Sequence, residues 1–106
     1  TFFSGGGLEE GKAVARRFKA KGDDLFHEEK YQEALQKYDK ATAAFPIFTE
    51  AYFKKGCAHR ALEEYLDALD AFEKVLKLNP CHKEALVSKE EMLQRLAEQS
   101  ASINYW

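Results

Sequence analysis

The sequence predicts an all-α fold: an α-solenoid of two antiparallel helical hairpins followed by a capping helix. The chain repeats itself, since residues 15–48 can be laid over residues 49–82 with eight identical positions. A fixed period of this size is typical of stacked repeats, in which one unit cannot bury its own apolar face. The 106 residues contain only two prolines, Pro46 and Pro80, which occupy the same position of each repeat. No segment alternates apolar and polar residues in the manner of a strand.

The first repeat predicts helices over residues 8–29 and 31–45. The earlier helix begins with two acidic residues, which suit the positive end of a helix dipole, and it carries an apolar stripe near helical spacing: Val14, Phe18, Leu25 and Phe26. The later helix places apolar residues at i, i+3, i+4, i+7 and i+10, which is one helical face: Tyr31, Ala34, Leu35, Tyr38 and Ala41. Pro46 limits the helix because proline lacks a backbone donor and disfavours helix in the preceding residue.

The second repeat predicts helices over residues 49–62 and 65–78, and a fifth helix follows over residues 82–100. The fourth helix has a continuous apolar stripe: Ala68, Leu69, Phe72, Val75 and Leu76. Asn79-Pro80 ends that helix. In the fifth helix, Leu86, Leu93 and Leu96 are the side chains that we expect to point inward.

Gly22 and Gly56 stand in the middle of predicted helices, 34 residues apart. Glycine there costs about 1 kcal/mol relative to alanine, so a packing reason is expected. We predict that a partner helix crosses so closely that a Cβ atom would clash, with Ala34 and Ala68 on the other side of the contact.

These residues resemble tetratricopeptide repeats, whose 34-residue pattern sets aromatic, glycine, alanine and proline residues at fixed offsets. The first repeat supplies Phe18, Gly22, Leu25, Ala34, Tyr38, Ala41 and Pro46, and the second supplies Tyr52, Gly56, Ala68, Phe72, Val75 and Pro80. The chain departs from the family pattern at Lys21 and Lys55, where leucine is preferred, and at His59, where tyrosine or leucine is preferred.

The domain organisation follows from this resemblance. Residues 1–7 are expected to form a flexible N-terminal segment, residues 8–100 the repeat domain, and residues 101–106 a C-terminal tail. Within the domain, residues 83–100 do not start a full third repeat, because the repeat positions of glycine and alanine fall on Glu90 and Ser102. This segment resembles the solvating helix that caps a repeat stack.

The resemblance implies a concave groove formed by the first helix of each hairpin and the capping helix. The residues predicted to line this groove are Arg16, Lys19, Asp23, Phe26, Phe53, Lys54, Cys57, Arg60, Val87 and Glu91. The same repeat positions also include Ala20, His27, Glu50, Ala61, Glu84 and Ser88. Phe26 and Phe53 can serve either the hairpin core or the groove. Cys57 is interpreted as a small buried apolar residue rather than a reactive thiol.

One class of these repeats grips the C-terminal carboxylate of cytosolic heat-shock chaperones. Lys19 matches the lysine of that carboxylate clamp. Asp23 and Lys54 stand where the class has asparagine, and Glu84 and Ser88 stand where it has lysine and arginine. Asp23 would repel a carboxylate and two basic partners are missing, so chaperone-tail binding is the less favoured form of the hypothesis.

Composition excludes several other functions. The net charge is −2, whereas nucleic-acid binders carry a basic excess. No apolar run of about 18 residues is present, so no membrane span is expected. The two cysteines form no CxxC pair and favour a reducing setting, cytoplasmic or nuclear. The sequence has no glycine-rich phosphate loop and no HExxH motif, so we expect neither an enzyme nor a metal site or cofactor.

The sequence therefore predicts a protein–protein interaction module, an adaptor or scaffold that binds a peptide segment of a partner protein in the groove. The alternative is self-association or docking within a larger protein. The apolar ends, Phe2-Phe3 and Ile103-Asn104-Tyr105-Trp106, are candidates for forming a homo-oligomer.

Overall fold

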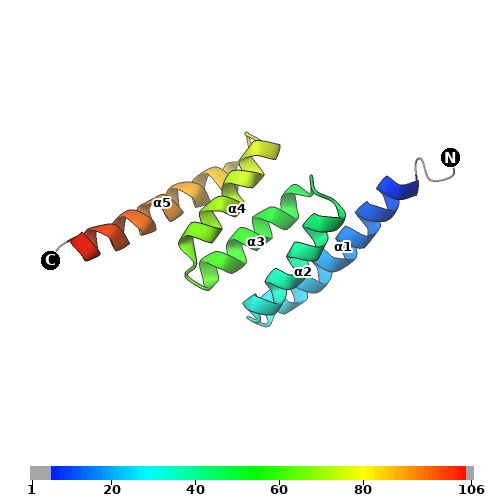
Figure 1. Cartoon of the computed structure of the whole chain (residues 1–106), viewed down its shortest axis with the longest axis horizontal. Coiled ribbons are helices and arrows are strands. Elements are labelled where there is room, and N and C mark those ends of the chain that lie inside the picture. Colours follow the sequence, from blue (N-terminus) through cyan, green and yellow to red (C-terminus); the bar gives the residue numbers. More distant parts are fainter. Residues whose placement is uncertain (1–5, 105–106) are drawn as a thin grey trace.

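The computed structural model describes residues 6–104, which form five helices and contain no strand (Figure 1). The helices are α1 (Gly6–His27), α2 (Tyr31–Ala44), α3 (Thr49–Ala61), α4 (Tyr65–Leu78) and α5 (Lys83–Asn104). All five predicted helices are confirmed, and the bounds of α4 agree to the residue. α1 begins two residues before the predicted position 8, at Gly6, and α5 continues beyond residue 100.

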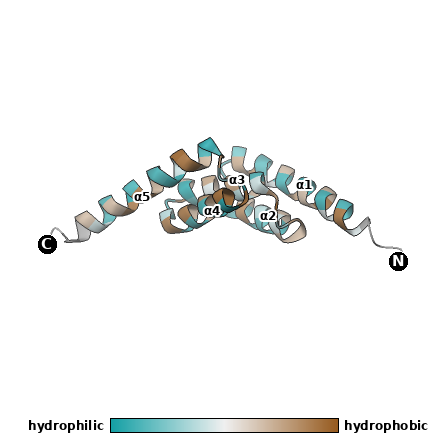
Figure 2. Ribbon diagram, turned by 90° about the horizontal axis from the view of Figure 1, so that it is seen from above, coloured by the Kyte–Doolittle hydropathy of each residue, from teal (hydrophilic) through white to brown (hydrophobic). Residues whose placement is uncertain are grey.

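The helices follow the predicted solenoid arrangement. α1 packs against α2, α3 against α4, and α2 joins the two hairpins by packing against α3. α5 then packs mainly against α4. In the view from above, α1, α3 and α5 lie along one side of the molecule and α2 and α4 along the other (Figure 2). The result is an elongated body of 63 × 30 × 20 Å. Within residues 6–104, no helix has the length and apolar character needed to cross a membrane.

Both hairpin turns have the same backbone construction, 34 residues apart. After α1, the Lys30 N–H donates to Leu25 O and the Glu29 N–H donates to Phe26 O, each at 2.9 Å. This pair of bonds is the Schellman motif, in which the residue after the C-cap is left-handed. Glu29 has φ 62° accordingly. The predicted end of the first helix at residue 29 is therefore wrong by two residues, because this residue turns the chain back.

The turn after α3 repeats this pattern, and its left-handed residue is Glu63 with φ 60°. Glycine adopts this conformation without the steric penalty of a Cβ, although it loses more chain entropy on folding. Glu63→Gly is therefore expected to raise the free energy of unfolding by about 0.5–1 kcal/mol, measured by urea denaturation. Glu63→Ala removes the same charge but keeps the Cβ, so an equal gain in that variant would contradict this explanation.

The two mid-helix glycines face aromatic rings. A Cβ atom built on Gly22 would lie 2.6 Å from Tyr38 Cε1, and one built on Gly56 would lie 2.5 Å from Phe72 Cε1. Both rings are fully buried. The predicted close approach is confirmed, but its predicted partners, Ala34 and Ala68, are wrong. Each glycine instead makes room for an aromatic ring, Tyr38 or Phe72, which follows the predicted alanine by four residues on the partner helix.

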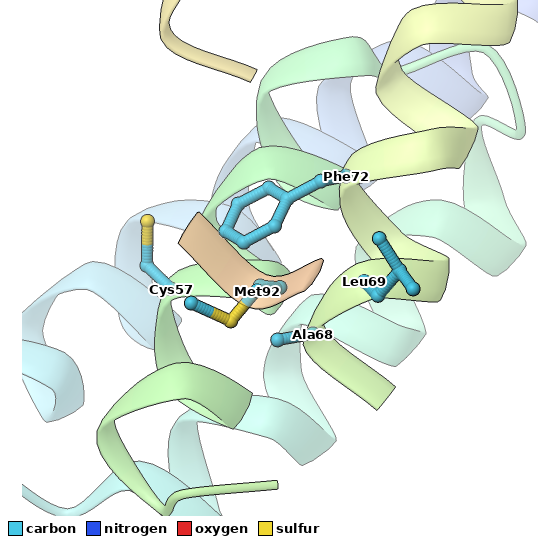
Figure 3. Packing of buried hydrophobic residues seen from close by; sticks show 5 residues of the cluster. All are labelled: Cys57, Ala68, Leu69, Phe72 and Met92. Carbon is cyan, nitrogen blue, oxygen red and sulfur yellow. The ribbon is translucent and has the colours of Figure 1, made fainter. Parts of the chain in front are cut away.

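The core of the second hairpin extends into α5. Figure 3 shows five buried residues gathered where α3, α4 and α5 meet: Cys57, Ala68, Leu69, Phe72 and Met92. On α5 the buried residues are Ala85, Ser88 and Met92, spaced at i, i+3 and i+7. Two of the three leucines expected inward are exposed, Leu86 by 46% and Leu93 by 41%. Each follows a buried-face residue by one position, which turns it about 100° around the helix, and small residues allow α5 to pack closely.

Candidate peptide-binding face

The surface formed by α1, α3 and α5 contains two hollows, one on each side of α3. The hollow between α1 and α3 has a volume of about 350 Å³ and is lined by Arg16, Lys19, Ala20, Asp23, Phe48 and Glu50. The hollow between α3 and α5 has a volume of about 410 Å³ and is lined by Phe53, Cys57, Arg60, Lys83, Glu84, Val87 and Ser88. Most of the residues predicted for the groove are thus brought together, in two groups.

Asp23 holds a polar network in the α1–α3 hollow. Its carboxylate accepts a 2.8 Å hydrogen bond from Lys19 Nζ and a 2.6 Å hydrogen bond from the Tyr38 hydroxyl. Burial by itself raises the pKa of Asp23, but the bonds from Lys19 and Tyr38 outweigh it, and the charges of Lys19 and Lys54 add to them. The pKa of Asp23 therefore lies below its ordinary value. The charge of Lys19 is neutralised within the chain.

The same network keeps Tyr38 protonated. Burial, followed by the hydrogen bond to Asp23 and its negative charge, raises the pKa of the Tyr38 hydroxyl far above its ordinary value. The hydroxyl therefore stays protonated at neutral pH and donates to Asp23. It connects the buried ring under Gly22 to the α1–α3 hollow, so the packing of the first hairpin also positions Asp23.

Phe26 and Lys54, both predicted for the groove, contact each other and line neither hollow. Lys54 Nζ lies 4.3 Å from the centroid of the Phe26 ring, within the range of a cation–π contact. The ring also meets Tyr31 edge to face, with centroids 5.1 Å apart, and packs against the cores of both hairpins. For Phe26, the structure favours the core role over that of a free groove anchor.

The α3–α5 hollow has an apolar floor. The half-buried Phe53 ring packs on Phe72, with centroids 5.6 Å apart, and on the His82 ring at 5.0 Å. Burial raises the pKa of Cys57, despite the opposing charges of Arg60 and Lys54, so its thiol stays neutral and acts as an apolar wall. Val87 stands on the rim with 69% of its surface exposed.

Arg60, which lines this hollow, pairs with Glu91 of α5. Arg60 Nη1 lies 3.1 Å from Glu91 Oε1, joining α3 to α5. The Arg60 guanidinium also lies 5.9 Å from the Phe72 ring centroid. Both residues are predicted groove residues, and the structure shows that they pair with each other. This pair links the two helices that line the hollow.

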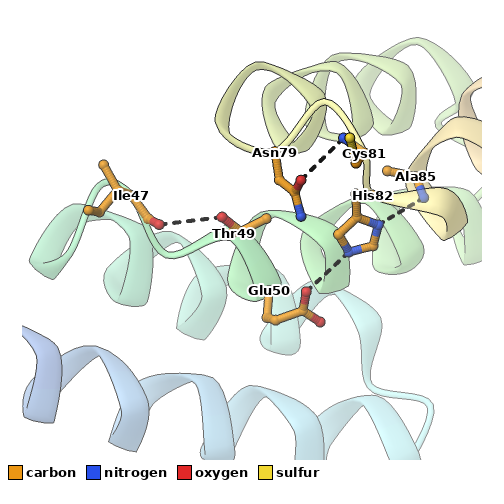
Figure 4. Close-up of polar contacts among 7 residues, drawn as sticks. All are labelled: Ile47, Thr49, Glu50, Asn79, Cys81, His82 and Ala85. Carbon is orange, nitrogen blue, oxygen red and sulfur yellow. Dashed lines mark hydrogen bonds and ion pairs between the residues drawn. The ribbon is translucent and has the colours of Figure 1, made fainter.

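His82 has a structural role that was not predicted from the sequence. The Ala85 backbone N–H donates to His82 Nδ1 at 3.1 Å (Figure 4). A backbone N–H can only donate, so Nδ1 is the acceptor and the ring proton resides on Nε2. Nε2 then donates to Glu50 Oε1 at 3.1 Å. His82 thus caps the start of α5 and fixes it to the start of α3.

Phe48 and Lys83 line the hollows and were missed as well. Phe48 belongs to the α2–α3 connection and Lys83 begins α5, so neither occupies a groove position of the repeat pattern. The signal available for Phe48 was its place in an apolar loop, Phe45-Pro46-Ile47-Phe48, since exposed loops rarely hold so many apolar side chains without a packing reason.

Three side chains among the described residues could hold a divalent cation. The ligand atoms of His59, Glu64 and Asp67 all lie within 4.8 Å of one another. His59 Nδ1 already contacts Glu64 Oε1 at 2.8 Å, and the adjoining hollow is also lined by Lys55 and Lys74, whose charges oppose a cation. The contact explains the position of His59 without a metal.

The chain is similar in sequence to a much longer known protein. Sperm-associated antigen 1 of Rattus norvegicus is 33% identical over 81 residues, which are 76% of this chain and 9% of that protein. This chain therefore spans about a tenth of the length of that curated relative.

Solved structures show the same architecture. The second TPR of Spaghetti (RPAP3), bound to the HSP90 peptide SRMEEVD, superposes with a TM-score of 0.80 at 19% identity, over 90% of this chain and 88% of that one. The first TPR of Spaghetti (RPAP3), bound to the same peptide, has a TM-score of 0.55 at 25% identity, over 81% of this chain and 95% of that one. The family model of the tetratricopeptide repeat matches residues 19–80 and 53–88. The chain belongs to the tetratricopeptide repeat family.

Proposed function

We propose that this chain is a protein-interaction module that binds an extended segment of a partner protein along the face of α1, α3 and α5. The observation that carries the proposal is the α3–α5 hollow, whose apolar floor of Phe53 and Cys57 is open to solvent beside Val87. An apolar side chain of the partner would fill it. The peptide complexes of the two Spaghetti (RPAP3) repeats support this use of the fold.

The hollow suits an anchor side chain for two physical reasons. Phe53 is held by Phe72 and His82, so its ring loses little freedom when a ligand covers it. Burying apolar surface contributes about 25 cal/mol per Å², and Val87 is exposed enough to provide such surface. Anchors in preformed apolar pockets commonly supply much of the affinity of an interface.

The geometry favours an internal segment over a chain end. Recognition of a C-terminal carboxylate in the manner of the clamp class would use Lys19, but Lys19 is bound to Asp23 at 2.8 Å. Glu84, where the clamp class has lysine, adds a negative charge to the rim of the α3–α5 hollow. Binding of a chaperone tail is therefore the weaker form of the proposal. Self-association through the aromatic ends concerns Phe2-Phe3 and the 103–106 segment, which lie outside the residues whose side chains the structure describes.

The proposal is tested with a random peptide library displayed against the whole chain, followed by binding measurements on amidated synthetic hits. Val87→Asp is expected to weaken binding at least tenfold, since a carboxylate would have to be desolvated beside the anchor. Leu66→Asp is the matched control, because Leu66 is 62% exposed on α4. Equal loss in both variants, or in neither, would contradict the proposed site.

A further inference from the structure

Arg16 is a cation without an internal partner. Among residues 7–101, whose side chains the structure describes, its side chain takes part in no ion pair, hydrogen bond or ring contact. The other two basic residues of α1 that line the same hollows are engaged: Lys12 pairs with Glu9 at 3.9 Å and lies over the Phe45 ring at 5.5 Å, and Lys19 pairs with Asp23. Arg16 therefore has its full hydrogen-bonding capacity available to a ligand.

The surroundings of Arg16 form a shaped site. Arg16 and Phe48 line the α1–α3 hollow, and both also line an adjoining hollow of about 240 Å³ with Lys12 and Phe45. The rings of Phe45 and Phe48 are held together, with centroids 6.2 Å apart. Arg16, an exposed residue, thus lines both hollows together with Phe48.

The two acidic groups that line the α1–α3 hollow already have hydrogen-bond partners within the chain. Glu50, which lines the α1–α3 hollow, accepts a hydrogen bond from His82, and Asp23 is bonded to Lys19 and Tyr38. Lys12 and Lys19 lie on either side of Arg16 along α1, and each is paired with a carboxylate of the same helix. A planar guanidinium binds a carboxylate through two parallel hydrogen bonds, and such charge-assisted bonds are about twice as strong as neutral ones. The site therefore complements a carboxylate.

We propose that Arg16 docks an acidic side chain, Asp or Glu, of the partner segment whose apolar anchor fills the α3–α5 hollow. The inference rests on the proposed function and adds to it the chemistry of the ligand: an internal segment with one acidic and one apolar determinant, read on opposite sides of α3. The carboxylate comes from a side chain, because an extended segment that crosses all three helices continues past both hollows.

The experiment uses a positional-scanning library of amidated peptides against four proteins: the unmodified chain, Arg16→Gln, Arg16→Glu and Arg17→Gln. Arg17 is exposed, next to Arg16 in sequence, and lines neither of its two hollows. It therefore controls for net charge. The unmodified chain and Arg17→Gln are expected to select Asp or Glu at one position. Arg16→Gln is expected to weaken binding of the selected peptides by about tenfold, and Arg16→Glu to select Lys or Arg at that position.

The outcomes separate the inference from the proposed function. An acidic preference that persists in Arg16→Gln, or that falls equally in Arg17→Gln, overturns the role of Arg16 while leaving the apolar site intact. Hits that bind only with a free C-terminal carboxylate also overturn it, in favour of chain-end recognition. A library that yields no binder to the unmodified chain contradicts the proposed function itself.

Discussion

Replacing Phe72 with alanine is expected to lower the free energy of unfolding by about 3–5 kcal/mol. The Phe72 ring, which belongs to α4, is fully buried. It fills the space beside Gly56 of α3 and lies in the same cluster as Met92 of α5, so it joins three helices. Its loss leaves a cavity beneath Phe53. The measurement is urea unfolding followed by circular dichroism, and peptide binding should weaken in parallel because Phe53 loses its support.

A double-mutant cycle tests whether Phe72 is the packing partner of Gly56. In the unmodified chain, a Cβ at position 56 would lie 2.5 Å from the ring, and such overpacking costs about 1–3 kcal/mol. Alanine recovers about 1 kcal/mol of helix propensity. Gly56→Ala should therefore destabilise the unmodified chain and become neutral or stabilising in Phe72→Leu. Simple additivity of the two changes would show that the contact does not explain the glycine.

Asp23→Ala is expected to cost about 1–3 kcal/mol, because it leaves the buried Tyr38 hydroxyl without its acceptor. Asp23→Asn keeps an acceptor for Tyr38 but loses the charge that holds Lys19, so it should cost less. Urea unfolding at pH 7 measures both. Equal costs in the two variants would mean that the hydroxyl, and hence this network, contributes little.

The same carboxylate makes stability depend on pH. The pKa of Asp23 in the folded protein lies below its ordinary value of 3.8, so the folded state favours the ionised form. Its contribution is present above pH 3.8 and is lost as the pH falls through the lower, folded value. The stability difference between the unmodified chain and Asp23→Asn should therefore shrink in acid. A difference that stays constant from neutral pH to below pH 3 would contradict the lowered pKa.

The helices were predictable because their signals are local. Apolar residues at helical spacing, such as those of 65–78, predict an element whose bounds agree with α4 to the residue. The predicted end of the first helix was wrong by two residues, because the left-handed residue of the turn is Glu29. Glycine is the usual residue at that position, so the sequence did not mark the turn. Side-chain direction on α5 was harder, because Leu86 and Leu93 form a plausible stripe by themselves. Which stripe is buried depends on how closely α4 approaches.

The candidate site was likewise predictable only in part. Repeat positions place most of the predicted residues in the two hollows of one face. They do not reveal which cations are free: Lys19 and Arg60 bond to carboxylates within the chain, whereas Arg16 does not. The repeat pattern also does not predict that Phe48, which belongs to a loop, lines the hollows.

By itself the sequence determined the number of helices, their pairing into hairpins and the family, because each depends on spacing within a stretch of about 34 residues. Tertiary structure alone decided the chemistry of the face. Tyr38 reaches Asp23, His82 reaches Glu50 and Glu91 reaches Arg60 only when separate helices are packed against one another. Charges interact through space over a few ångströms, so the groups that remain available to a partner are those that the packed helices leave unpaired.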